Sequence, residues 1–96
     1  MEEVPFVVCI WRDAWADSVT AVTLKDVAET HKPELITTTG WLLHEDSEGV
    51  SVANERCGDG SYRGRSFIYH PMIVSITTVK LVKPRKAKPH EETSAC

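Results

Sequence analysis

Apolar side chains fill a short stretch near the start of the chain, VPFVVCIW, at residues 4–11. It is rich in Val, Ile and aromatic residues and too short for a helix beside Pro5, so it is predicted to be the first strand. Both faces are apolar, which indicates burial on two sides or contact with a neighbouring subunit. Trp11 could therefore face the core or form part of a subunit interface. Asp13 and Asp17 then end the pattern.

A short helix is predicted within residues 23–33, TLKDVAETHKP. Thr23 and Asp26 have the spacing of a capping box, and Pro33 prevents the helix from continuing. One helix face carries the apolar residues Leu24, Val27 and Ala28. Because about two turns are not stable alone, we expect this helix to pack on a sheet.

The next stretch predicts a β-hairpin, with strands at residues 35–44 and 50–56 around the polar turn EDSEG. Gly40 lies inside the first of these strands. A residue without a side chain there lets the strand bend sharply or lets another backbone come close.

The loop CGDGSYRGR at residues 57–65 is predicted from its glycines, and a strand at 66–69 follows it. Tyr69-His70-Pro71 is then expected to form a one-turn corner before a final strand at about 72–79. The prolines and charges after Lys80 predict a basic, disordered tail at residues 81–96, beyond a single domain at 1–80. This order of elements predicts a mainly β fold, a five-stranded SH3-like or Sm-like barrel with one short helix between strands one and two.

Composition places this 96-residue chain among globular proteins, with 42% hydrophobic and 26% charged residues. No apolar run approaches the roughly 18 residues of a membrane span, and the first residues are acidic where a signal peptide would be basic. We therefore expect a cytoplasmic protein with no membrane partner. A domain this small has a thin core, so association with its own copies is also expected.

The net charge and the cysteine content limit the kinds of binding site that we expect. The net charge is -3, yet five basic residues lie within nine positions near the C-terminus: Lys80, Lys83, Arg85, Lys86 and Lys88. Phosphate binding by a broad basic face is not expected, although the basic tail could contact nucleic acid. The three cysteines, Cys9, Cys57 and Cys96, lack close pairs, which favours incidental thiols over zinc ligands or a disulfide framework.

Two stretches resemble the Sm-like family, which includes bacterial Hfq-type RNA chaperones. Gly40, Leu42 and Asp46 have the spacing of the first Sm motif, and IYHPMIVSI is similar to the second, at the corner between strands four and five. Val50 occupies the position of the Asn that lines the Sm base pocket, so the resemblance implies the barrel rather than that pocket. The whole chain also resembles small phage-encoded proteins, which implies an origin in which a host component is bound and neutralised.

Candidate ligand contacts lie in and after the Gly-rich loop. Free backbone N–H groups at residues 58–64 could hold an anion, Arg63 and Arg65 could close on it, and Tyr62 could stack on a base. His70 at the corner could add a hydrogen bond. No Walker or Rossmann spacing is present, so no cofactor is predicted, and an ordinary surface loop is the alternative.

Trp15 is predicted to be an interface residue, because a tryptophan in an acidic loop with Asp13 and Asp17 is often exposed. Catalysis is not predicted: the one candidate pair, Cys57 with His44 or His70, would place the nucleophile in a flexible loop.

Two functions are therefore expected. The first is a non-catalytic, oligomeric binding protein of phage origin that sequesters a nucleotide-like or oligonucleotide ligand through Tyr62, Arg63, Arg65 and His70. The alternative is an inhibitor of a host protein, possibly a nucleic-acid mimic, that presents Trp15 with the acidic residues Asp13, Asp17, Glu45, Asp46 and Glu48. A virion assembly role stays open.

Overall fold

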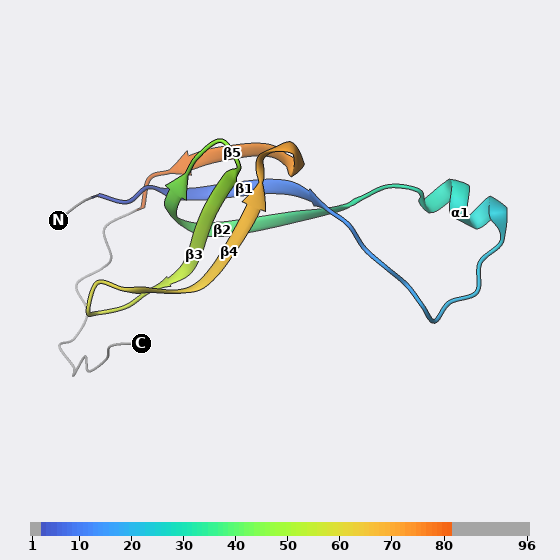
Figure 1. Cartoon of the computed structure of the whole chain (residues 1–96), viewed down its shortest axis with the longest axis horizontal. Helices are drawn as coiled ribbons and strands as arrows, with labels where there is room; N and C mark the ends of the chain where they lie inside the picture. The colour runs from blue at the N-terminus through green and yellow to red at the C-terminus, as the bar shows by residue number, and fades with distance from the viewer. Residues whose placement is uncertain (1–2, 82–96) are drawn as a thin grey trace.

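The computed structural model describes residues 3–81, which form a single antiparallel sheet of five strands (Figure 1). The strand order is β4-β3-β2-β1-β5. The elements are β1 (Phe6–Asp13), α1 (Leu24–Thr30), β2 (Glu34–Glu45), β3 (Gly49–Arg56), β4 (Tyr62–Tyr69), the 3-10 turn η1 (His70–Met72) and β5 (Ile73–Val79). The prediction of a mainly β fold with one short helix between strands one and two is confirmed.

The sheet curves but does not close. Strands β4 and β5 are its two edges, and they are not hydrogen-bonded to each other. The expected barrel, and with it the SH3-like or Sm-like architecture, is therefore not established. The predicted tail at residues 81–96 lies almost wholly outside the described residues.

The β2–β3 hairpin is held by its turn and by a close approach of its two strands. The carboxylate of Asp46 accepts hydrogen bonds from the backbone N–H groups of Glu48 and Gly49, at 2.9 and 3.2 Å. At Gly40, a Cβ atom would collide with the backbone carbonyl oxygen of Ala53. The expectation that Gly40 admits a neighbouring backbone is confirmed.

The His-Pro corner is the predicted single turn. In η1, Pro71 lies in the first turn and the backbone N–H of Ile73 bonds to the His70 carbonyl. The backbone N–H of His70 also donates to the carbonyl of Glu48 at 3.0 Å, which ties this corner to the β2–β3 turn. Proline fits here because its fixed φ suits the turn and the missing N–H ends strand pairing.

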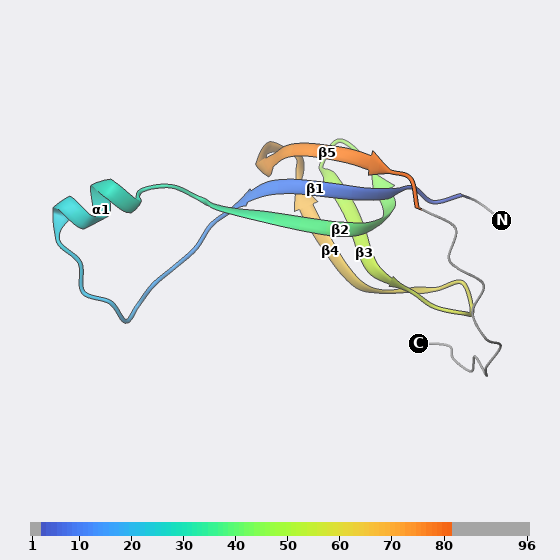
Figure 2. The ribbon, with the colours of Figure 1, turned by 180° about the vertical axis from the view of Figure 1, so that it is seen from behind.

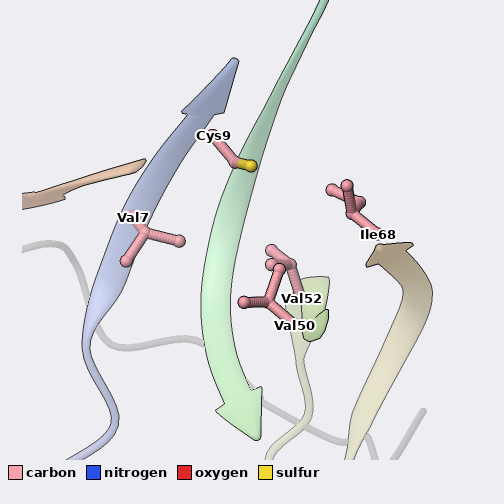
Figure 3. Close-up of a cluster of buried hydrophobic side chains, with 5 residues drawn as sticks. All are labelled: Val7, Cys9, Val50, Val52 and Ile68. Carbon is pink, nitrogen blue, oxygen red and sulfur yellow. The ribbon is translucent and has the colours of Figure 1, made fainter. Parts of the chain in front are cut away.

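The core is small and lies on one side of the sheet (Figure 3). It consists of five almost fully buried side chains: Val7, Cys9, Val50, Val52 and Ile68. Trp11, Leu42 and Ile73 pack against it. Cys9 is a free thiol whose burial raises its pKa. Cys57 is disulfide-bonded, so the expectation of an incidental thiol is wrong at that position.

Residues 14–33 form a projecting arm that extends away from the sheet between β1 and β2 (Figures 1 and 2). The arm carries α1 at its far end, and α1 has no buried residue. The capping box is present as predicted, because Asp26 N–H donates to Thr23 Oγ1 and Thr23 N–H to Asp26 Oδ2. The expectation that the helix packs on the sheet is wrong.

Strand β4 begins earlier than expected. It starts at Tyr62, not at Ser66, so half of the expected loop belongs to the sheet. The side chain of Arg63 pairs across the strands with Glu55, which stabilises this extension.

Candidate binding surfaces

The projecting arm carries an apolar hollow of about 380 Å³. It is lined by Trp15, Asp17, Thr20, Val22, Val27, Thr30 and His31. The indole Nε1–H of Trp15 donates to the carbonyl of Lys32 at 2.6 Å, although the side chain is 54% exposed. This hydrogen bond joins the two sides of the arm and holds the ring beside the hollow.

The first turn of the arm is ordered by Asp17. One of its carboxylate oxygens accepts hydrogen bonds from the backbone N–H groups of Val19 and Thr20, at 2.9 and 3.2 Å. These bonds favour the charged form, so the pKa of Asp17 is lowered below its ordinary value. The carboxylate thus stays charged at the edge of the hollow.

Much of the arm's apolar surface is uncovered. Val19 and Leu24 are each 90% exposed, and Trp15, Val22, Val27 and Leu35 are exposed as well. Scattered exposed apolar residues are common, whereas a run of them on one projecting segment is a pattern typical of interaction sites.

The same region is acidic. Between residues 13 and 34 there are five acidic side chains and two lysines. At the base of the arm, Asp13 and Glu34 are directly paired across the strands. Two like charges at such a position repel each other, and a nearby cation would relieve this repulsion.

The four predicted ligand contacts do not form one pocket. Tyr62 begins β4 and His70 follows its last residue, so the length of the strand, about 25 Å, lies between them. Arg63 is held by Glu55, with Nε–Oε1 and Nη2–Oε2 distances of 2.6 and 3.3 Å. This pairing lowers the pKa of Glu55 and raises that of Arg63, and it occupies the guanidinium fork that an anion would need.

Arg65 belongs to a different group of residues, on the outer face of β4. Arg65, Phe67 and Tyr69 alternate along this edge strand and therefore share one face. Phe67 and Tyr69 are both exposed, and their rings pack edge to face with ring centroids 5.0 Å apart. From the sequence, Phe67 and Tyr69 were assigned no binding role, although their spacing of two residues in a strand was an available signal.

The predicted interface residues divide between core and arm. Trp11 packs against the core, and its Nε1–H donates to Thr38 Oγ1 at 2.9 Å. Trp15 and Asp17 are exposed on the arm, and Asp13 at its base is half-buried. The other acidic residues of the alternative hypothesis, around Asp46, lie at the opposite end of β2, so the acidic set is two separate surfaces.

Two histidines lie beside the second acidic surface, around Asp46. His70 Nε2 lies 2.8 Å from the carbonyl oxygen of Asp46 and 3.9 Å from Glu45 Oε2. His44 Nε2 lies 3.6 Å from Asp46 Oδ2. Of the two acidic surfaces, the arm is the one where the acidic residues lie among uncovered apolar side chains.

Groups for catalysis or metal binding are not assembled in the part of the chain that the structure describes. Cys57 follows the last residue of β3, whereas His44 is paired with Ser51 near the start of β3 and His70 lies beyond that end. Residues 3–81 contain no cluster of three His, Cys, Asp or Glu side chains placed to hold a metal ion. Nor does this range contain a helix with the length and apolar character needed to cross a membrane.

A polar hollow of about 340 Å³ lies elsewhere, on the sheet. Threonine, serine and asparagine side chains dominate its lining, which comprises Thr37, Thr38, Thr39, Val52, Asn54, Gly64 and Ser66. Thr38 already accepts the Trp11 hydrogen bond, and the hollow carries no charged group.

Comparison of this chain with protein-family models, curated proteins and solved structures finds no match. The binding surfaces are therefore interpreted from their own geometry.

Proposed function

We propose that this chain is a non-catalytic binding protein whose projecting arm docks onto a cationic surface of a partner protein. The observation that carries this proposal is the exposed tryptophan beside an apolar hollow, on an acidic segment that adds nothing to the core. A phage origin, which the sequence resemblance implies, would make the partner a host protein.

Ordering the arm costs free energy. An ordered segment loses conformational entropy, which packing normally offsets. Here α1 buries no side chain, while Val27 and Trp15 leave much of their apolar surface in water. Covering these residues with a partner would release that surface from water at about 25 cal/mol per Å². Trp15 is the natural anchor, since large rigid aromatics dominate binding energy at interfaces.

Affinity capture with matched baits tests this proposal. The intact chain is immobilised beside the double variant Trp15→Ala/Val27→Asp, which removes the anchor and places a charge in the hollow. Val74→Asp is the control, because it adds the same charge at a valine of similar exposure away from the arm. Val74 on β5 is 47% exposed and Val27 is 43% exposed. A protein with a basic surface should bind the intact chain and the control but not the double variant. Equal capture by all three baits would refute the role of the arm.

The outer face of β4 favours a second candidate function, capture of a nucleotide or short oligonucleotide. Exposed Phe67 and Tyr69 offer an aromatic surface for a base, and Arg65 makes no ion pair with any described residue. This set replaces Tyr62 and His70, which lie at the two ends of β4, and Arg63, whose guanidinium is held by Glu55.

Native mass spectrometry of gently purified protein tests the second candidate. A reproducible added mass in the nucleotide range, lost in the variant Arg65→Glu/Phe67→Ala, would support it. Arg63→Gln is the control, since Arg63 is already paired with Glu55. An intact chain without added mass, or an adduct that survives the double variant, would exclude this site.

A further inference from the structure

The arm and the end of β5 lie at opposite ends of the molecule (Figures 1 and 2). Strand β5 pairs with β1 so that Val79 lies opposite Phe6, at the start of β1. The arm leaves from the other end of β1, where Asp13 pairs with Glu34. The chain beyond Val79 therefore emerges far from the arm.

The sequence after Val79 complements the arm in both charge and apolarity. It reads KLVKPRKAK at residues 80–88, with five basic residues and the apolar pair Leu81 and Val82. The arm offers an apolar hollow among acidic side chains. A short segment with apolar residues for the hollow and flanking cations for the carboxylates is the partner that this surface fits.

Distance prevents the apolar pair of this segment from reaching the arm of its own chain. The hollow beside Trp15 lies about 30 Å from Val79, which is the length of β1 plus two residues. Leu81 and Val82 reach at most about 10 Å from Val79, and Arg85 and Lys86 at most about 25 Å. The apolar pair can fill the hollow only on another molecule.

Contact between two arms is disfavoured by charge. Five acidic and two basic side chains between residues 13 and 34 make each arm a net anion. Bringing two such segments together would place like charges at close range. A cationic occupant meets no such penalty.

We propose that the arm of one copy binds residues 80–88 of a second copy, so that the protein assembles head to tail. This inference rests on the proposed function, because it names an occupant for the same arm. The contact is heterologous, since arm and segment are different surfaces, and it therefore builds rings or open chains rather than a closed symmetric pair. Where a partner protein binds the arm, it displaces the neighbouring copy.

Charge reversal in the full chain tests the assembly. The arm variant is Glu29→Lys/Glu34→Lys, which spares the capping box and the Asp17 turn. The tail variant is Lys83→Glu/Arg85→Glu/Lys86→Glu. Light scattering after gel filtration, at about 50 mM and about 500 mM salt, should show oligomers of the intact chain that dissociate at high salt. Each variant alone should be monomeric, and mixing the two should restore association, because the intact arm of the tail variant can bind the intact tail of the arm variant.

A direct binding assay separates this inference from the proposed function. A labelled peptide of residues 80–89 is titrated with the full-length tail variant, whose arm is intact. Binding that weakens about tenfold at high salt and is lost on adding Glu29→Lys/Glu34→Lys supports the inference. An intact chain that is monomeric at both salt concentrations, or a peptide that does not bind, overturns it.

The two failures are distinguishable. If the peptide does not bind while Trp15→Ala/Val27→Asp still abolishes partner capture, only the head-to-tail assembly is wrong. If that double variant leaves partner capture unchanged, the proposed function is wrong whatever the peptide does.

Discussion

At Gly40 a missing side chain determines how closely two strands pack. The carbonyl of Ala53 occupies the space that a Cβ would need, and Ala53 itself is fully buried. Asp46 has a complementary role, since its carboxylate satisfies two backbone N–H groups in the turn of the same hairpin. These two residues fix the register and the close packing of β2 and β3.

Gly40→Ala should lower the free energy of unfolding by about 1–3 kcal/mol, because the added methyl group forces the two backbones apart. Urea denaturation followed by circular dichroism measures the change. Gly60→Ala is the comparison: its Cβ meets no atom within 4 Å, and its φ of +91° alone should cost about 1 kcal/mol. Equal losses at the two positions would show that the close approach at Gly40 is not the cause.

Acid should weaken the hairpin through Asp46. Its pKa is lowered below the ordinary value of 3.8, chiefly by the hydrogen bond from the Glu48 backbone. A carboxyl with a lowered pKa in the folded state stabilises the protein above its unfolded pKa and loses that contribution as pH falls through the folded pKa. The melting temperature of Asp46→Asn should therefore lie below that of the intact chain at pH 6, and the difference should shrink below pH 3.8. A difference that is constant with pH would contradict this account.

Among the elements, local signals in the sequence were sufficient for the strands, the helix cap and the His-Pro corner. The start of β4 was not predictable in this way, because glycines indicated a loop and the Glu55–Arg63 pair that extends the strand joins residues eight positions apart. The same pair removes Arg63 from the predicted ligand site. The predicted packing of α1 on the sheet was also wrong. The capping box predicts the helix itself, but no signal in the sequence indicates whether the helix contacts a sheet.

Replacing residues 14–33 with Asn-Gly should leave the sheet folded. Asp13 and Glu34 are already paired, so a two-residue turn closes the β1–β2 hairpin directly. Since α1 has no buried residue, the melting temperature should change little, whereas Ile68→Ala in the core should cost about 2–5 kcal/mol. Thermal unfolding followed by circular dichroism compares the replacement variant with Ile68→Ala and with the intact chain. An unfolded replacement variant would mean that the arm belongs to the folding unit.

The whole molecule separates a small curved sheet, which contains the core, from an acidic arm to which we assign recognition. The buried core lies entirely within the sheet, and the exposed tryptophan and apolar hollow lie on the arm. The basic segment leaves from the opposite end of β1. This separation predicts that binding and folding can be changed independently.

Hydrogen–deuterium exchange of the captured complex, compared with the free protein, tests the central claim most directly. If the arm is the docking surface, amides in residues 17–33 should exchange more slowly in the complex, while those of β4 and β5 should be unchanged. Protection confined to β4, with the arm exchanging as in the free protein, would contradict the account and favour the outer face of β4 as the binding surface.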